Sequence, residues 1–207
     1  MFARSTSLNA RPAMIDAGVA HVRDTVMPAL SHLEGYLGLS MMMERESGRG
    51  IVTSAWRSEP AMRSSGERAA TIRDDAARVF GAATTEVEEW EVAVMHRAHH
   101  TREGTWMRTT WLGLEAADLD GVVEMFKTGT LAKIEDLPGF CSASLMLNRA
   151  DLRAVTTVGY DDRSSLEYSR EGANAVRDEA ARQMDAHLLG VAEFELVVAH
   201  LHIPEMV

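Results

Sequence analysis

The chain has 207 residues, one cysteine and a formal net charge of −10, from 21 lysines and arginines against 31 aspartates and glutamates. This acidic balance argues against nucleic-acid binding, because contact with a phosphate backbone requires a basic stripe. A single cysteine excludes an intramolecular disulfide, and no apolar run approaches the roughly 18 residues of a membrane helix. We therefore expect a cytoplasmic protein without a nucleic-acid or membrane partner.

The chain consists of two copies of one sequence. Sliding it against itself by 104 residues aligns residues 2–103 with 106–207 without a gap, and 27 of the 102 pairs are identical, where chance gives about seven. The densest run pairs residues 72–78 with 176–182. The duplication predicts two domains, 1–96 and 106–207, joined by a polar linker at 97–105, each large enough for a modest core.

Each copy opens with a segment of alternating character, which predicts a strand, and continues with an apolar stripe at spacings of three and four, which predicts a helix. The strands are expected at residues 2–8 and 106–112, and the helices at 15–33 and 119–137. Pro12 suits the first turn of the first helix. Pro28 lies inside that helix and predicts a kink or an early stop.

Two strands, a second helix and a last strand follow in each copy. Ser58 and Asp162 precede the second helix as N-caps, since their side chains can accept hydrogen bonds from its first free N–H groups. Gly66 and Gly172 fall inside this helix and predict a bend in both copies. The strands are expected at 36–45, 50–56 and 87–96, and at 140–149, 154–160 and 191–200. The order βαββαβ, written twice, is the ferredoxin-like arrangement of the α+β class.

Three segments carry a family resemblance: Leu-Pro-Gly-Phe at 137–140, the run 48–62 that contains Ser-Ala-Trp-Arg-Ser, and Val-Glu-Glu-Trp-Glu-Val-Ala-Val at 87–94. They resemble the helix end, the third strand and the last strand of the antibiotic biosynthesis monooxygenase (ABM) family. Members of that family usually pair two copies into a dimeric α+β barrel, sheet against sheet. The resemblance implies that this chain is a fused pseudo-dimer, either monomeric or in a higher homo-oligomer.

The resemblance leaves two functions open, because the ABM family is chemically mixed. The first is a cofactor-independent monooxygenase that oxidises a small aromatic or polyketide-like molecule with O₂. The second is a non-catalytic protein that binds a small molecule or acts in a stress response. Heme-degrading relatives carry a histidine where this chain has Asp74 and Asp178, and a carboxylate is a poor axial ligand. Heme degradation is therefore disfavoured, and no cofactor is expected.

Cofactor-free oxygenation requires a dry pocket, a proton acceptor and polar donors that hold the substrate anion. The candidates for catalysis are charged or titratable residues on strands, namely Arg4, Arg108, His96 and His200. The candidates for substrate binding are aromatic residues on strands, namely Trp56, Tyr160, Trp90 and Trp111. Each has a structural alternative, since aromatic side chains on strands are usually core and strand-end histidines usually pack or face solvent.

The arginine candidates also have a structural interpretation, because acidic residues recur beside them on neighbouring strands and predict a paired charge network. These residues are Glu89, Glu91, Glu193 and Glu195. On the second helices, the neighbours Arg73–Asp74 and Arg177–Asp178 are interpreted as surface ion pairs. The spacing of four residues also predicts surface pairs between Asp74 and Arg78 and between Asp178 and Arg182.

A histidine group near the linker has a spacing that could hold a metal. His96, His99 and His100 lie there, and the second copy keeps His200 and His202. No cysteine or carboxylate accompanies either group in sequence, so exposed histidines are the favoured interpretation and no metal is expected.

The two copies differ in the bulk of their apolar residues. Trp106, Trp111 and Phe126 of the second copy replace Phe2, Ser7 and Val22 of the first. The second pocket is therefore expected to be more occluded, or shaped for a flatter ligand.

Overall fold

The computed structural model describes residues 1–115, 118–201 and 203–207. The chain divides into two compact units: unit 1 contains residues 1–90 and 195–203, and unit 2 contains 91–194 and 204–207. This division differs from the sequence repeat, because the last strand of each copy begins in one unit and ends in the other. The repeat boundaries at 96 and 106 stay a prediction.

Both copies follow the predicted order of elements. The first contains β1 (Phe2–Asn9), a 3₁₀ turn (Pro12–Met14), α1 (Ile15–His21), a π-helical turn (Val22–Val26), α2 (Met27–Ser31), β2 (Tyr36–Glu44), β3 (Arg49–Trp56), α3 (Glu59–Ser64), α4 (Gly66–Phe80) and β4 (Thr85–Arg97). The second contains β5 (Trp106–Leu114), α5 (Leu119–Met125), a π-helical turn (Phe126–Thr130), α6 (Leu131–Glu135), β6 (Phe140–Asn148), β7 (Arg153–Tyr160), α7 (Arg163–Gln183) and β8 (Ala186–Leu201).

The sheet of each unit takes a strand end from the other copy. In unit 1, β3 lies antiparallel between β1 and β2, and β2 also pairs with the end of β8, from Gly38 opposite Leu201 to Met43 opposite Glu195. In unit 2, β7 lies antiparallel between β5 and β6, and β6 pairs with the end of β4. The order β1-β3-β2-β8-β5-β7-β6-β4 closes on itself. The predicted α+β class, with two ferredoxin-like repeats and a barrel-like strand order, is confirmed.

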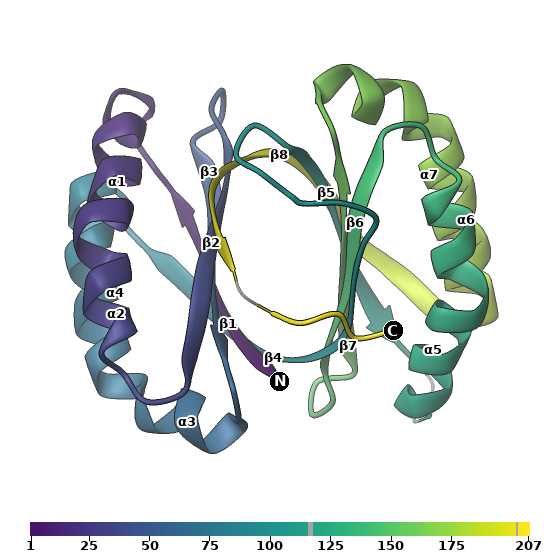
Figure 1. Ribbon diagram of the computed structural model, residues 1–207, viewed down its shortest axis with the longest axis horizontal. Helices are drawn as coiled ribbons and strands as arrows, with labels where there is room; N and C mark the ends of the chain where they lie inside the picture. Colours follow the sequence, from purple (N-terminus) through teal and green to yellow (C-terminus); the bar gives the residue numbers. More distant parts are fainter. Residues whose placement is uncertain (116–117, 202) are drawn as a thin grey trace. The chain divides into compact units, whose positions relative to one another are not determined.

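Helices cover one face of the sheet in each unit, namely α1, α2 and α4 in unit 1 and α5, α6 and α7 in unit 2 (Figure 1). The predicted apolar stripe faces that sheet, because its residues are buried in the core of the unit. In unit 1 these are Ile15, Val19, Val22, Val26 and Leu30, with Phe80 from α4. In unit 2 they include Leu119, Phe126, Leu131 and Ile134.

The predicted N-caps are confirmed. The side chain of Ser58 accepts a hydrogen bond from the N–H of Ala61, and that of Asp162 accepts one from the N–H of Ser165. These bonds fix where the second helix of each copy begins, because they satisfy N–H groups that have no partner inside the helix.

The predicted bend at Gly66 is confirmed, since α3 ends at Ser64 and α4 begins at Gly66. The bend predicted at Gly172 is wrong, because α7 is continuous from Arg163 to Gln183. A single glycine inside a helix costs about 1 kcal/mol relative to alanine, which is too little to interrupt a helix packed along its length.

The early stop predicted at Pro28 is wrong. Pro28 lies in α2, which follows α1 and the π-helical turn without a break, and the helix continues to Ser31. Ser31 is equivalent to Glu135, where α6 ends without a proline. Both copies carry a π-helical turn before this point, so the irregularity belongs to the repeat.

Among the described helices, none combines the length and apolar character that crossing a bilayer requires.

Candidate functional site

A cavity lies between the sheet and the helices of each unit. Both cavities open to solvent, and with the solvent space at the mouth included they amount to about 510 Å³ in unit 2 and about 580 Å³ in unit 1. Most lining positions of the two cavities are equivalent in the repeat, so the chemical differences between them come from substitutions at matched places.

Tyr160, at the end of β7, lines the cavity of unit 2 and is fully buried. Its Oη atom has no hydrogen-bond partner among the described residues. Burial raises the pKa of Tyr160 to about 12, so the hydroxyl keeps its proton at neutral pH and can donate it to a ligand. A buried hydroxyl without a partner costs about 1–3 kcal/mol. A ligand oxygen bound here recovers that free energy.

Two arginines line the same cavity. Arg108 on β5 donates from Nη1 to Oε1 of Glu193 at 2.7 Å and from Nη2 to Oδ1 of Asn174 at 2.5 Å. Arg177 on α7 donates from Nη1 to the same Asn174 oxygen at 2.9 Å. Burial lowers the pKa of Arg108 from its ordinary value, and the carboxylate of Glu193 opposes that shift. The Arg108 guanidinium group stays charged at neutral pH, because arginine does not lose its proton in proteins.

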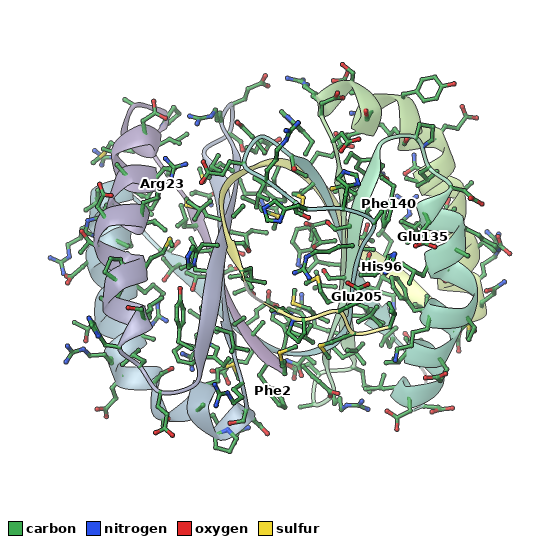
Figure 2. All side chains as sticks on the ribbon, viewed as in Figure 1. Phe2, Arg23, His96, Glu135, Phe140 and Glu205 are labelled. Atoms are coloured by element: carbon green, nitrogen blue, oxygen red, sulfur yellow. The ribbon has the colours of Figure 1, made fainter. Side chains whose placement is uncertain are left out.

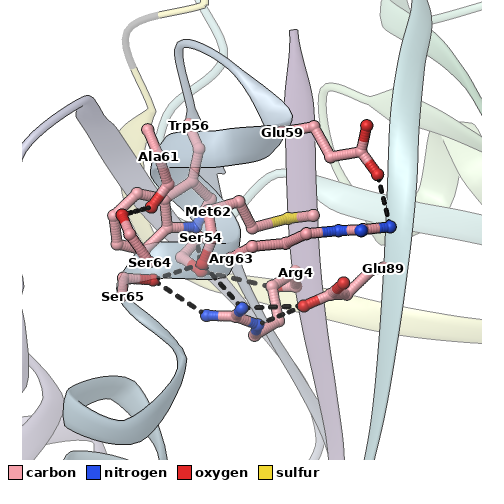
Figure 3. A network of polar contacts seen from close by, with 10 residues as sticks. All are labelled: Arg4, Ser54, Trp56, Glu59, Ala61, Met62, Arg63, Ser64, Ser65 and Glu89. Carbon is pink, nitrogen blue, oxygen red and sulfur yellow. Dashed lines mark hydrogen bonds and ion pairs between the residues drawn. The ribbon is translucent and has the colours of Figure 1, made fainter.

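Arg4 is the equivalent of Arg108 and lines the cavity of unit 1. Figure 3 shows its guanidinium group between Ser65, the carbonyl of Met62 and Glu89. Nε and Nη2 donate to Oε1 of Glu89 at 3.0 and 2.7 Å, Nη1 donates to Oγ of Ser65 at 3.0 Å, and Nη2 reaches the Met62 oxygen at 2.8 Å. The protein itself therefore uses each nitrogen of this guanidinium group.

The predicted charge network is confirmed, with a division of roles among the acidic residues. Glu89 pairs with Arg4, and Glu193 pairs with both Arg108 and Arg170. The other two glutamates pair elsewhere: Glu91 with Arg149 at the end of β6, and Glu195 with Arg45 beyond the end of β2. These last two pairs join each crossing strand to the unit that receives it.

Trp56 is the equivalent of Tyr160 but does not belong to the lining of unit 1. It is fully buried, and its Nε1 donates to Oγ of Ser54 at 3.1 Å. Its ring meets that of Tyr36 edge to face, with ring centroids 5.7 Å apart. The polar atom at this position is therefore satisfied in unit 1 and unsatisfied in unit 2.

The other two tryptophan candidates lie outside both linings. Trp90 on β4 is buried and donates from Nε1 to Oγ of Ser5 at 2.8 Å. Trp111 on β5 is half-buried. Their proposed contact with a substrate stays a prediction.

The histidine candidates also lie outside both linings. His96 stacks on Phe140, with ring centroids 6.1 Å apart, and its ring nitrogens contact Glu135 and Glu205 (Figure 2). His200 is exposed on β8, opposite Leu39. The structure thus places Tyr160 with Arg108 in one cavity and Arg4 in the other, away from both histidines.

Reasoning from the sequence interpreted Arg177 only as a member of a surface ion pair and did not single out Asn174. Arg177 lies in the densest run of the repeat, where it matches Arg73, and that identity is a signal that could have singled it out. Asn174 gave no such signal, since the equivalent residue is Ala70.

The other histidines of the possible metal group lie near the linker and at the end of the second copy. His99 contacts Asp161 at 2.7 Å, and His202 lies outside the described residues. Over the part of the chain that the structure describes, no three His, Cys, Asp or Glu side chains form a metal-binding group.

The expected pair between Asp74 and Arg78 is wrong, because Arg78 contacts the carboxylate of Asp75, one turn away, and only the backbone oxygen of Asp74. The predicted pair between Arg177 and Asp178 is confirmed, at 2.7 Å from Nη2 to Oδ1.

Solved structures with the same architecture include an anthrone oxidase-like protein, with 14% identity, a TM-score of 0.66 and coverage of 100% of this chain and 94% of that chain. Another is a ferredoxin-fold protein from Listeria monocytogenes related to antibiotic biosynthesis monooxygenases, with 8% identity, a TM-score of 0.55 and coverage of 96% of both chains. The chain therefore has the ABM-like α+β barrel fold. No family model matches it.

Two proteins of Mycobacterium tuberculosis (strain ATCC 25618 / H37Rv) are similar in sequence over all of this chain. "Uncharacterized protein Rv2558" is 46% identical over 208 residues, which are 88% of its length. "Uncharacterized protein Rv2557" is 44% identical over 207 residues, which are 92% of its length. Such identity over whole chains shows common descent, and this chain belongs to the same family as Rv2557 and Rv2558.

Proposed function

We propose that the cavity of unit 2 binds a small aromatic, polyketide-like phenol or enol, and that the protein oxidises this molecule with O₂ without a cofactor. The observation that carries the proposal is the buried, unpaired hydroxyl of Tyr160, in a largely apolar cavity that also contains the charged side chain of Arg108. The solved structures named for an anthrone oxidase-like protein and for antibiotic biosynthesis monooxygenases support this general kind of activity.

The cavity offers separate contacts for the ring and for the oxygen of such a ligand. Tyr160 donates a hydrogen bond to the ligand oxygen, and the charges of Arg108 and Arg177 favour its anionic form. Apolar side chains form most of the remaining wall, namely Leu112, Phe126, Ile134, Leu137, Val158 and Val176. This wall covers the ring and excludes water, which strengthens the electrostatic contacts.

The lining also restricts the substrate. Among its described residues there is no histidine, aspartate or glutamate to accept a proton. The substrate must therefore ionise readily, and the two guanidinium charges assist by lowering the pKa of the bound hydroxyl or enol. Acidic phenols and enols meet this requirement.

The reaction follows from the bound anion. The anion transfers one electron to O₂, and the resulting superoxide joins the substrate radical at a ring carbon, which forms a peroxide. The O–O bond then breaks as that carbon becomes a carbonyl. One oxygen atom stays on the carbon, and the other leaves as water with two hydrogens, namely the one that the carbon carried and the proton that the hydroxyl or enol group released on ionisation. The cavity contributes by holding the anion and excluding solvent.

Heme does not fit the residues at the expected ligand positions. The side chains of Asp74 and Asp178 are 69% and 52% exposed, and neither lines a cavity. We therefore derive no step through heme, and the proposal is cofactor-independent.

The test is a thermal-shift and oxygen-uptake screen of the full chain with hydroxylated polycyclic phenols and enols. Tyr160→Phe is expected to weaken binding of a hit about tenfold, the value of one hydrogen bond, and to slow oxygen uptake. Tyr36→Phe is the matched control, because Tyr36 also has a buried, unpaired hydroxyl and a pKa raised to about 12, but lies outside both linings. Equal binding by the two variants would contradict the site.

A binding protein without turnover is the second candidate function, favoured by the lining's lack of a proton acceptor. Binding that depends on Tyr160, with no oxygen uptake for any bound compound, would establish it over the oxygenase.

A further inference from the structure

The cavity of unit 1 contains a cationic group that the protein leaves available. Arg73 on α4 lines this cavity, and its Nε atom is buried without a hydrogen-bond partner among the described residues. The contact with Asp74 is 3.9 Å from Nε to Oδ1, and the Asp74 side chain is 69% exposed. At that distance the pair is beyond hydrogen-bonding range, and exposure to water weakens it further.

The equivalent arginine in unit 2 is held on three atoms. Arg177 donates from Nε and Nη2 to Oδ1 of Asp178 at 2.8 and 2.7 Å, and from Nη1 to Oδ1 of Asn174 at 2.9 Å. In unit 1, Ala70 replaces Asn174 and cannot accept a hydrogen bond. This substitution removes one of the two acceptors that hold the equivalent guanidinium group in unit 2.

The rest of the unit 1 wall is mostly aliphatic. Val22, Val26, Leu30, Leu39 and Ile72 line it together with Phe80. Arg4 is in the same lining, but Glu89, Ser65 and the carbonyl of Met62 already engage its nitrogens. Nε of Arg73 therefore offers an incoming anion an unpaired cationic donor.

We propose that the cavity of unit 1 is a second ligand site, which binds an unbranched aliphatic carboxylate with its head group on Arg73 and its chain against the valines and leucines. A carboxylate can accept hydrogen bonds from Nε and a terminal nitrogen of one guanidinium group at the same time. Its alkyl chain suits a wall in which Val22 and Val26 stand where unit 2 has Phe126 and Thr130. This site is separate from the one proposed in unit 2 and does not depend on it.

The test is isothermal titration calorimetry of the full chain with octanoate, decanoate and decan-1-ol. Two added methylenes are expected to tighten binding about tenfold from octanoate to decanoate, by the burial of apolar surface. Arg73→Met removes the charge and is expected to weaken decanoate binding at least about tenfold. Decan-1-ol, which lacks the anionic group, is expected to bind weakly to the wild-type protein and to be insensitive to this substitution.

Two further variants locate the ligand. Arg177→Met changes the matched position of unit 2 and is expected to leave the decanoate affinity unchanged. Arg73→Lys keeps the positive charge and is expected to retain part of the decanoate affinity. Thermal melting of each variant without ligand checks that the fold is intact. Decanoate binding that survives Arg73→Met, falls in Arg177→Met or is absent from the wild-type protein would overturn the proposal. None of these outcomes bears on phenol binding through Tyr160.

Discussion

Arg108 and Arg177 share one hydrogen-bond acceptor, the Oδ1 atom of Asn174. The amide oxygen lies between a strand arginine and a helix arginine and so ties α7 to β5 over the cavity of unit 2. In unit 1 the equivalent residue is Ala70, and there Arg73 and Arg4 have no common partner in the described contacts.

Asn174→Ala is expected to destabilise the protein by about 1–3 kcal/mol, because it leaves donors of the buried Arg108 and of Arg177 without an acceptor. Urea unfolding of the variant and the wild-type chain measures the difference. Asn148→Ala is the control, since Asn148 bonds only to neighbours in an exposed turn. A larger effect at Asn148 than at Asn174 would contradict the role assigned to the shared acceptor.

Tyr160→Phe is expected to stabilise the free protein by about 1 kcal/mol, because it removes a buried hydroxyl that has no partner. The same substitution weakens the proposed ligand binding, so stability and function move in opposite directions. The midpoint of urea unfolding is the measurement. Tyr168→Phe is the control, because Tyr168 is 80% exposed and its hydroxyl stays hydrated. A destabilised Tyr160→Phe would show that the hydroxyl has a partner after all.

The protein is expected to lose stability in alkali between about pH 10 and pH 12. Burial raises the pKa of both Tyr36 and Tyr160 from 10.0 to about 12, so over this interval the folded state keeps protons that the unfolded state releases. The stabilisation is complete below pH 10 and is lost as pH rises through 12, at about 1.4 kcal/mol per pH unit for each tyrosine. Urea unfolding at intervals of pH measures the slope.

The double variant Tyr36→Phe/Tyr160→Phe is expected to show a shallower alkaline slope than the wild-type chain. An unchanged slope would assign the effect to other groups.

Cutting the loop between β4 and β5 is expected to leave the protein assembled. The end of β8 pairs with β2, and the end of β4 pairs with β6, so each unit contains strands from both fragments. A protease site placed at His99–Glu103 gives the two pieces. Native mass spectrometry is expected to show them as one complex that separates only in denaturant. Free fragments without denaturant would contradict the observed strand exchange.

Gly18→Ala is expected to destabilise the protein by about 1–3 kcal/mol. A Cβ atom at Gly18 on α1 would lie 2.1 Å from Cε1 of Phe80 on α4, so the two helices would have to separate. Gly66→Ala is the matched control, because a Cβ atom there meets nothing within 4 Å. That variant is expected to be as stable as the wild type or up to about 1 kcal/mol more stable. Thermal unfolding distinguishes the two.

The polar partners of the candidate residues could not be predicted from the sequence. Arg73 and Arg177 are identical in the repeat, yet Arg177 is held on three atoms and Arg73 has an unpaired Nε. Trp56 and Tyr160 occupy matched strand ends, yet Tyr160 alone of the two lines a cavity. These differences accompany substitutions on the same element, namely Asn174 or Ala70 three residues before the arginine, and Ser54 or Val158 two residues before the aromatic side chain.

The sequence by itself determined the duplication, the order of elements and the starts of the second helices at Ser58 and Asp162. It could do so because apolar periodicity and capping act within a few residues along the chain. Only the tertiary structure decided that the ends of β4 and β8 are exchanged between the units. It also decided which polar groups of the cavity-lining residues have no hydrogen-bond partner. Those features rest on contacts between distant residues, such as Arg45 with Glu195 across 150 positions, and no local pattern encodes which partner such a side chain meets.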